Sequence, residues 1–109
     1  MIDVKILRDK SGRAVGIRSL GHTDYAENGY DIVCAAVSVL ELNFANSVAE
    51  LTDARFETHF GEEEGSFDFV LLGKRNENAE LLLNSLLLGY AAVQQEYGSE
   101  YLLIKDQEV

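Results

Sequence analysis

Cys34 and His22 are the two residues whose side chains could together carry out covalent catalysis. Cys34 is the single cysteine in the sequence, and His22 is one of two histidines. A histidine within hydrogen-bonding reach of a thiol can accept its proton and so generate a nucleophilic thiolate. The alternative stays open, because a lone cysteine is commonly a small buried apolar residue and His22 can be an ordinary polar residue at a strand end.

The predicted elements around the pair favour the catalytic interpretation. Asp31 directly precedes a helical apolar stripe and is the expected N-cap, which makes Cys34 the third helical residue, in the first turn. The positive end of the helix dipole and free backbone N–H groups there would stabilise a thiolate and lower its pKa. His22 closes a predicted strand that leads through one loop to this helix. In a two-layer fold the strand end and the helix start share an edge, so His22 can reach Cys34.

Two polar residues near Cys34 have two possible roles each. Ser38 follows Cys34 by four residues and therefore lies on the same helix face, one turn deeper. Its hydroxyl can bond a group of the site or, equally well, a preceding backbone carbonyl. Asp31 can act as the N-cap alone or can also orient His22.

Residues 23–30 join the predicted strand to the predicted helix and have neither a strand nor a helix pattern. They are Thr23, Asp24, Tyr25, Ala26, Glu27, Asn28, Gly29 and Tyr30. Because this loop has few apolar side chains to bury and a hinge at Gly29, we expect it to be mobile without substrate. We expect substrate to order it, with Tyr25 or Tyr30 packing on an aromatic substrate side chain.

The hydrophobic pattern predicts an α+β fold with a single domain over residues 1–109. Strands are expected at residues 2–8, 15–20, 55–60 and 66–71, with a short last strand at 101–104. Helical periodicity covers residues 31 to about 53 and 79–97, which gives the order ββαββα(β). Both helices carry wide apolar stripes, and the strands cannot bury a face alone. The economical arrangement packs both helices on one face of a mixed or antiparallel sheet.

The charge of the chain restricts its partners. Nine Lys and Arg against 19 Asp and Glu give a net charge of −10. This disfavours nucleic acid and anionic membrane surfaces and favours a basic partner. The longest uninterrupted apolar runs are far shorter than the ~18–20 residues of a membrane span, and no signal-peptide pattern is present. One cysteine fits a reducing compartment, so we expect a cytoplasmic location.

We expect no metal and no cofactor. One cysteine and two distant histidines have none of the spacings of a zinc site, and the sequence has no glycine-rich nucleotide motif. The run Glu62-Glu63-Glu64 falls in a predicted turn between two strands and is interpreted as a solvated charged tip.

The second predicted helix carries more apolar surface than one sheet face can cover. Its leucines nearly encircle it: Leu81, Leu82, Leu83, Leu86, Leu87 and Leu88. Because an exposed apolar patch of that size is unusual on a monomer, we expect a homodimer.

At the candidate site the chain resembles the ribosomal-processing cysteine protease family, Prp. The resemblance lies in Gly21-His22, in loop residues Asp24, Tyr25 and Gly29, and in the block 31–38, Asp-Ile-Val-Cys-Ala-Ala-Val-Ser. The Leu-Leu-Leu-Gly sequence at 86–89 is also similar to the last helix of that family. Thr23 departs from the pattern, where a small Ala is expected.

The resemblance implies a cysteine endopeptidase that removes the N-terminal extension of a bacterial large-subunit ribosomal protein. It implies that cleavage follows a hydrophobic, aromatic-containing motif, and that the enzyme is a homodimer with a mobile loop over its site. Carried over, Cys34 is the nucleophile and His22 the general base and then acid. Gly21 lets the backbone pass close to the substrate, and Asp31 and Ser38 support the pair.

Two alternatives remain at the level of the sequence. One is a non-catalytic acidic dimer that binds a basic ribosomal protein or assembly factor, with Cys34 only packed in the interior. The other is a thiol enzyme with a different acyl substrate. The negative charge fits a basic ribosomal precursor as substrate and fits the first alternative as well.

Overall fold

The computed structural model describes residues 1–21, 30–61 and 66–109, and only the backbone of Tyr30 and Asp31. Every structural statement below concerns that part of the chain. The elements in chain order are β1 (Ile2–Arg8), β2 (Ala14–Gly21), α1 (Tyr30–Leu51), β3 (Arg55–Phe60), β4 (Phe67–Leu72), α2 (Glu77–Tyr97) and β5 (Leu102–Glu108).

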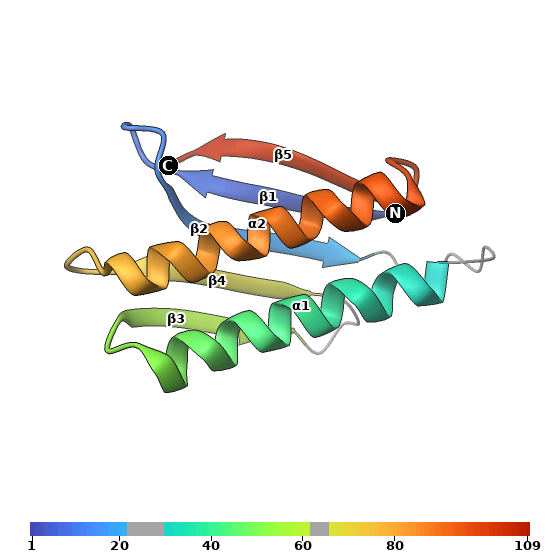
Figure 1. The fold of residues 1–109 in the computed structure, drawn as a ribbon. Helices are drawn as coiled ribbons and strands as arrows, with labels where there is room; N and C mark the ends of the chain where they lie inside the picture. The colour runs from blue at the N-terminus through green and yellow to red at the C-terminus, as the bar shows by residue number, and fades with distance from the viewer. Residues whose placement is uncertain (22–29, 62–65) are drawn as a thin grey trace.

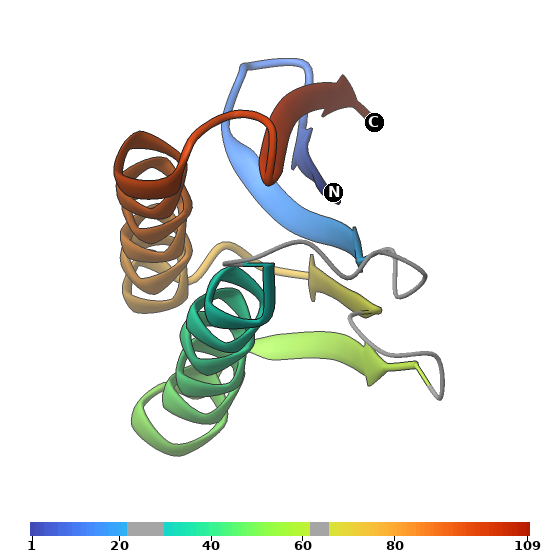
Figure 2. The same cartoon turned by 90° about the vertical axis from the view of Figure 1, so that its right-hand side faces the viewer.

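The five strands form one mixed sheet in the order β3-β4-β2-β1-β5. Neighbouring strands are antiparallel except β1 and β5, which run parallel. Both helices lie side by side on one face, and no described helix covers the other face (Figures 1 and 2). The predicted α+β architecture, with two helices on one face of a mixed sheet, is confirmed.

The core lies between the helices and the sheet and is built from alternate strand residues and the apolar helix stripes. The strands contribute Ile2, Val4, Ile6, Ile17, Phe67, Phe69 and Leu102. The helices contribute Val33, Val37, Phe44, Val48, Leu83, Leu86, Tyr90 and Val93. Phe44 of α1 meets Phe69 of β4 edge-on, with ring centroids 4.5 Å apart, and this contact holds α1 against the β3–β4 side of the sheet.

Several element boundaries differ from the sequence-based expectation, among them those of β5 and α2. The last strand continues to Glu108 instead of ending at Ile104, because its backbone pairs with β1 along the whole of Ile2–Arg8. Its polar second half has no apolar alternation that would reveal a strand. The second helix begins at Glu77, two residues early, because the Asn76 side chain accepts a hydrogen bond from the backbone N–H of Ala79 and caps it.

Helix α1 also differs from expectation in its hydropathy. Ile32–Leu51 is long and apolar enough to cross a membrane by length and composition, with a mean hydropathy of 1.6. Core helices of soluble proteins pass the same test. The buried side of α1 contributes Val33, Val37 and Val48 to the core, but only 33% of the apolar window is buried, and Ile32, Val39 and Leu42 are exposed.

Candidate active site

The end of β2 and the start of α1 lie at the same end of the molecule, as the two-layer arrangement requires (Figure 1). Gly21 is the last residue of β2, is half-buried, and pairs with Ile2 of β1. The connection that carries His22 starts at this glycine, and α1 carries Cys34. The fold therefore brings the end of the strand that precedes His22 and the start of the helix that carries Cys34 to the same end of the molecule.

Cys34 is the fifth residue of α1, not the third as predicted, because the helix begins at Tyr30. Asp31 is correspondingly the second helical residue and not the N-cap. The backbone N–H of a fifth residue takes part in the helix, and the dipole effect falls off after the first turn, so both sources of thiolate stabilisation are weaker than the sequence suggested. The Cys34 side chain is half-buried and packs against the core. Because helical side chains tilt toward the N-terminus, its sulfur leans back over the first turn.

Of the other predicted site residues, the structure describes some and not the rest. Ser38 is exposed on α1, one turn after Cys34. Tyr30, expected in the loop, is instead the first residue of α1. His22 and residues 23–29 lie outside the described residues, so the contact between His22 and Cys34 and the mobility of the loop stay predictions.

A buried polar cluster lies deeper in the same helix layer and was not predicted from the sequence. Glu41 is only 3% exposed, and the hydroxyl of the fully buried Tyr90 donates a 2.7 Å hydrogen bond to its Oε2. Burial raises the pKa of Glu41 to about 7. The Ser19 hydroxyl of β2 is near enough to lower that pKa, although it makes no hydrogen bond of good geometry to the described residues. The cluster therefore connects α1, α2 and β2.

The position of Glu41 in the pattern could have revealed its burial. It is four residues after Val37 and three before Phe44, so it occupies a core position of the α1 stripe. It also follows Cys34 by seven residues, two turns along nearly the same face.

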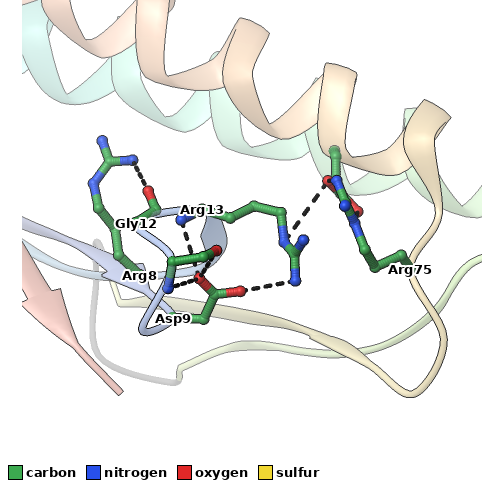
Figure 3. Close-up of polar contacts among 7 residues, drawn as sticks. Arg8, Asp9, Gly12, Arg13 and Arg75 are labelled. Carbon is green, nitrogen blue, oxygen red and sulfur yellow. Dashed lines mark hydrogen bonds and ion pairs between the residues drawn. The ribbon is translucent and has the colours of Figure 1, made fainter.

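The opposite end of the molecule is closed by ion pairs (Figure 3). Asp9 in the β1–β2 turn accepts hydrogen bonds from Ser11 and Arg13, and the Ser11 hydroxyl is the main cause that lowers the pKa of Asp9. Arg75 makes two hydrogen bonds to Glu80 of α2, the shorter at 2.6 Å, which lower the pKa of Glu80. These groups satisfy one another and fasten the turn to the start of α2, so they are a structural feature and not a second site.

Among residues 1–21, 30–61 and 66–109, no three His, Cys, Asp or Glu residues are grouped as metal ligands would be.

Comparisons with known proteins identify the family of the chain. Residues 1–102 match the family model described as "Cysteine protease Prp". The Ribosomal processing cysteine protease Prp of Staphylococcus aureus is 29% identical over 103 residues, which cover 94% of this chain and 97% of the relative.

Two solved structures of the essential ribosomal processing protease Prp from S. aureus share the fold. The complex with a substrate peptide has a TM-score of 0.89 at 27% identity and covers 98% of this chain and all of the other. The complex with a covalently linked product peptide has a TM-score of 0.86 at 28% identity, with the same coverage.

The fold and these matches first define the class of protein, which is a cysteine protease. Within that class the match to residues 1–102 is specific, and the chain belongs to the Prp family.

Proposed function

We propose that this cysteine protease removes the N-terminal extension of a bacterial large-subunit ribosomal protein precursor. The observation that carries the proposal is the family match over residues 1–102 together with the position of the single cysteine on α1. The names of the relatives, which are ribosomal processing proteases, support the substrate class. A basic precursor also suits a chain with a net charge of −10.

Cys34 is the proposed nucleophile and His22 the proposed general base. The imidazole of His22 removes the thiol proton, and the sulfur of Cys34 attacks the scissile carbonyl carbon. Collapse of the tetrahedral intermediate breaks the C–N bond, and His22 returns the proton to the leaving amine. A water molecule, deprotonated by His22, then releases the extension from the acyl-enzyme. The covalently linked product peptide of a relative supports such a covalent route.

Three further residues are proposed to support the pair. Gly21, without a side chain, leaves room for the substrate backbone where β2 ends. Asp31 and Ser38 lie one turn before and one turn after Cys34 and are proposed to orient His22 and the substrate, respectively. Loop residues 23–29 are proposed to close over the substrate.

The Cys34→Ser variant tests the nucleophile. A serine hydroxyl is far less ionised than a thiol, so cleavage of a peptide spanning the precursor junction should fall by at least ~10³-fold while the melting temperature stays unchanged. The matched control is Asn46→Ala at an exposed position of the same helix, which should fold equally well and keep the activity of the parent. Residual activity of C34S within about tenfold of the parent would contradict the assignment.

Iodoacetamide labelling separates the enzyme from the non-catalytic acidic dimer. A catalytic thiol in the native protein should react rapidly near neutral pH, and removal of His22 should slow the reaction. A Cys34 that is protected until the protein unfolds would favour the binding module.

We also propose that the enzyme is a cytoplasmic homodimer of single-domain protomers, joined through the outer surface of the helix layer. Between α1 and α2 lies an almost wholly apolar groove of about 480 Å³, lined by Ala35, Ala36, Val39, Leu40, Gly89, Ala92 and Val93. Val39 and Leu88 beside it are 64% and 74% exposed. Neither helix contains a Lys or an Arg, and a second copy would cover this surface.

A further inference from the structure

The face of the sheet opposite the helices carries a row of ionisable residues that crosses all five strands. The pairing register places His59, Asp68, Arg18, Lys5 and Lys105 opposite one another on β3, β4, β2, β1 and β5 in turn. Their chain neighbours Val4, Ile17 and Phe69 are buried under the helices. Because strand side chains alternate, the row faces away from the helices.

Three adjacent members of this row, Arg18, Lys5 and Lys105, form what we call the basic row. Lys5 stands between Arg18 on one side and Lys105 on the other, and like charges directly opposite each other destabilise a sheet. Asp68 offsets part of the charge through an ion pair with Arg18 at 3.4 Å. All three cations are exposed. This arrangement runs from the central strand β2 to the edge strand β5, and an anionic partner would relieve the repulsion between its cations.

The surface around the basic row is hollowed and partly apolar. Arg18 lines two hollows, of about 510 Å³ toward β3 and about 340 Å³ toward β5. Leu7 and Val70 line the first, and Leu20 lines the second. Asp3 borders the second hollow, and Glu57 and Asp68 border the first, so the positive charge is concentrated over β2, β1 and β5. A partner would therefore meet cations flanked by aliphatic side chains.

We propose that this face binds an extended acidic peptide segment that carries both carboxylates and apolar side chains. The basic row spans two strand spacings, roughly 10 Å, and carboxylates at positions i and i+2 of an extended peptide stand about 6.7 Å apart. Two such carboxylates fit within the basic row, and the partly apolar hollows beside it accept aliphatic side chains.

Charge and composition disfavour other occupants. Single-stranded RNA favours large aromatic side chains on which bases stack, and the outward-facing positions of the described strands have no Phe, Tyr or Trp. The overall charge of −10 would also repel it. A second copy related by a two-fold axis through Arg18 would place that guanidinium against itself. The proposal does not depend on the proposed catalytic residues, since the row lies on the face away from α1.

The test uses the full-length protein and an acetylated hexapeptide of alternating Glu and Leu. A peptide of alternating Lys and Leu and an oligouridylate are the comparison probes. Binding is followed by changes in the NMR signals of backbone amides and by a titration at low and at high salt. The double variant Lys5→Glu/Lys105→Glu reverses the charge of the row, and Lys74→Glu, at an exposed lysine of the β4–α2 connection, is the matched control.

The Glu–Leu peptide should perturb amides of β1, β2 and β5, and salt should weaken its binding. The double variant should lower its affinity at least ~10-fold, whereas Lys74→Glu should change it less than about twofold. The double variant should still fold, because the new carboxylate on β1 faces Arg18 of β2 and the pair of carboxylates on β1 and β5 replaces a pair of like charges that the sheet already tolerates. Its melting temperature checks this. Equal affinity for the Glu–Leu and Lys–Leu peptides, signal changes confined to the helices, or no effect of charge reversal would overturn the proposal. Tighter binding of oligouridylate than of the Glu–Leu peptide would identify RNA as the partner instead. A change in sedimentation caused by the double variant alone would identify a second copy of the chain as the partner.

Discussion

At the scale of single residues, Glu41 is the group whose protonation is most closely coupled to folding. Its pKa is raised from an ordinary 4.5 to about 7 in the folded protein, mainly by burial. Above about pH 4.5 the unfolded chain therefore releases a proton that the folded chain still holds. The free energy of unfolding therefore falls as the pH rises from about 4.5 to about 7, and it falls no further above that range.

The Glu41→Gln variant should remove this pH dependence. Glutamine keeps an acceptor for the Tyr90 hydroxyl but cannot ionise, so the variant should be more stable than the parent by about 1–3 kcal/mol at pH ~8 and nearly equal at pH ~5. Urea denaturation at the two pH values measures this. Glu50→Gln, at an exposed position of the same helix, should leave the pH dependence intact. An unchanged pH dependence in E41Q would show that Glu41 does not cause it.

The residues of the site were only partly predictable from the sequence. The type and spacing of Cys34, Ser38 and Gly21 identified the helix and the strand end that the structure brings to one edge. The position of Cys34 within its helix was not predictable, because two extra residues at a helix start leave the apolar stripe unchanged. The burial of Glu41 was hidden by its charge, which normally marks an exposed position.

At the scale of elements, β2 and β4 approach each other closely at Gly16. A Cβ at this position would lie 2.5 Å from the backbone carbonyl oxygen of Phe69 and 3.1 Å from a methyl group of Leu7. Since a backbone oxygen cannot move without disturbing the ladder, Gly16→Ala should destabilise the protein by about 1–3 kcal/mol. Thermal or urea unfolding measures the loss.

Gly12→Ala is the comparison for Gly16→Ala. A Cβ at Gly12 meets nothing within 4 Å, but the φ of +88° disfavours alanine there. It should cost about 1 kcal/mol from backbone strain alone. If Gly16→Ala costs less than Gly12→Ala, the close approach of β2 and β4 is not rigid.

The elements themselves were well predicted where the hydrophobic period was strong. Apolar residues alternate at Phe67 and Phe69 and form a stripe along α1. These patterns predicted a strand and a helix correctly, with nearly the correct ends for each. The second half of β5 was missed because Lys105–Glu108 is polar and is held by backbone pairing with β1, which leaves no mark in a pattern of side chains.

At the scale of the whole molecule, the positively charged side chains are confined to the sheet and the connections and are absent from the helices. All nine Lys and Arg residues lie in the strands and their connections, and the two helices have none. The outer surface of the helix layer is consequently apolar or acidic, which is the basis for the proposed dimer.

The Leu88→Lys variant tests that dimer. Placing a cation beside the apolar groove should convert a species of twice 12.1 kDa into one of 12.1 kDa in sedimentation at micromolar concentration. The control Leu20→Lys introduces the same charge on the opposite face of the sheet and should leave the mass unchanged. A parent protein that already sediments at 12.1 kDa would contradict the dimer.

The parallel pairing of β1 with β5 has a consequence for how the protein is made. The first strand to be synthesised completes its hydrogen bonding only when the last strand arrives, so the sheet closes through a contact nearly as long in sequence as the chain itself. Until then β1 presents an open edge to which another nascent chain can pair. Contacts of such sequence separation slow folding, so the assembled sheet should appear only after translation has passed residue 108. Any activity that depends on the assembled sheet should therefore be absent until β5 has paired with β1.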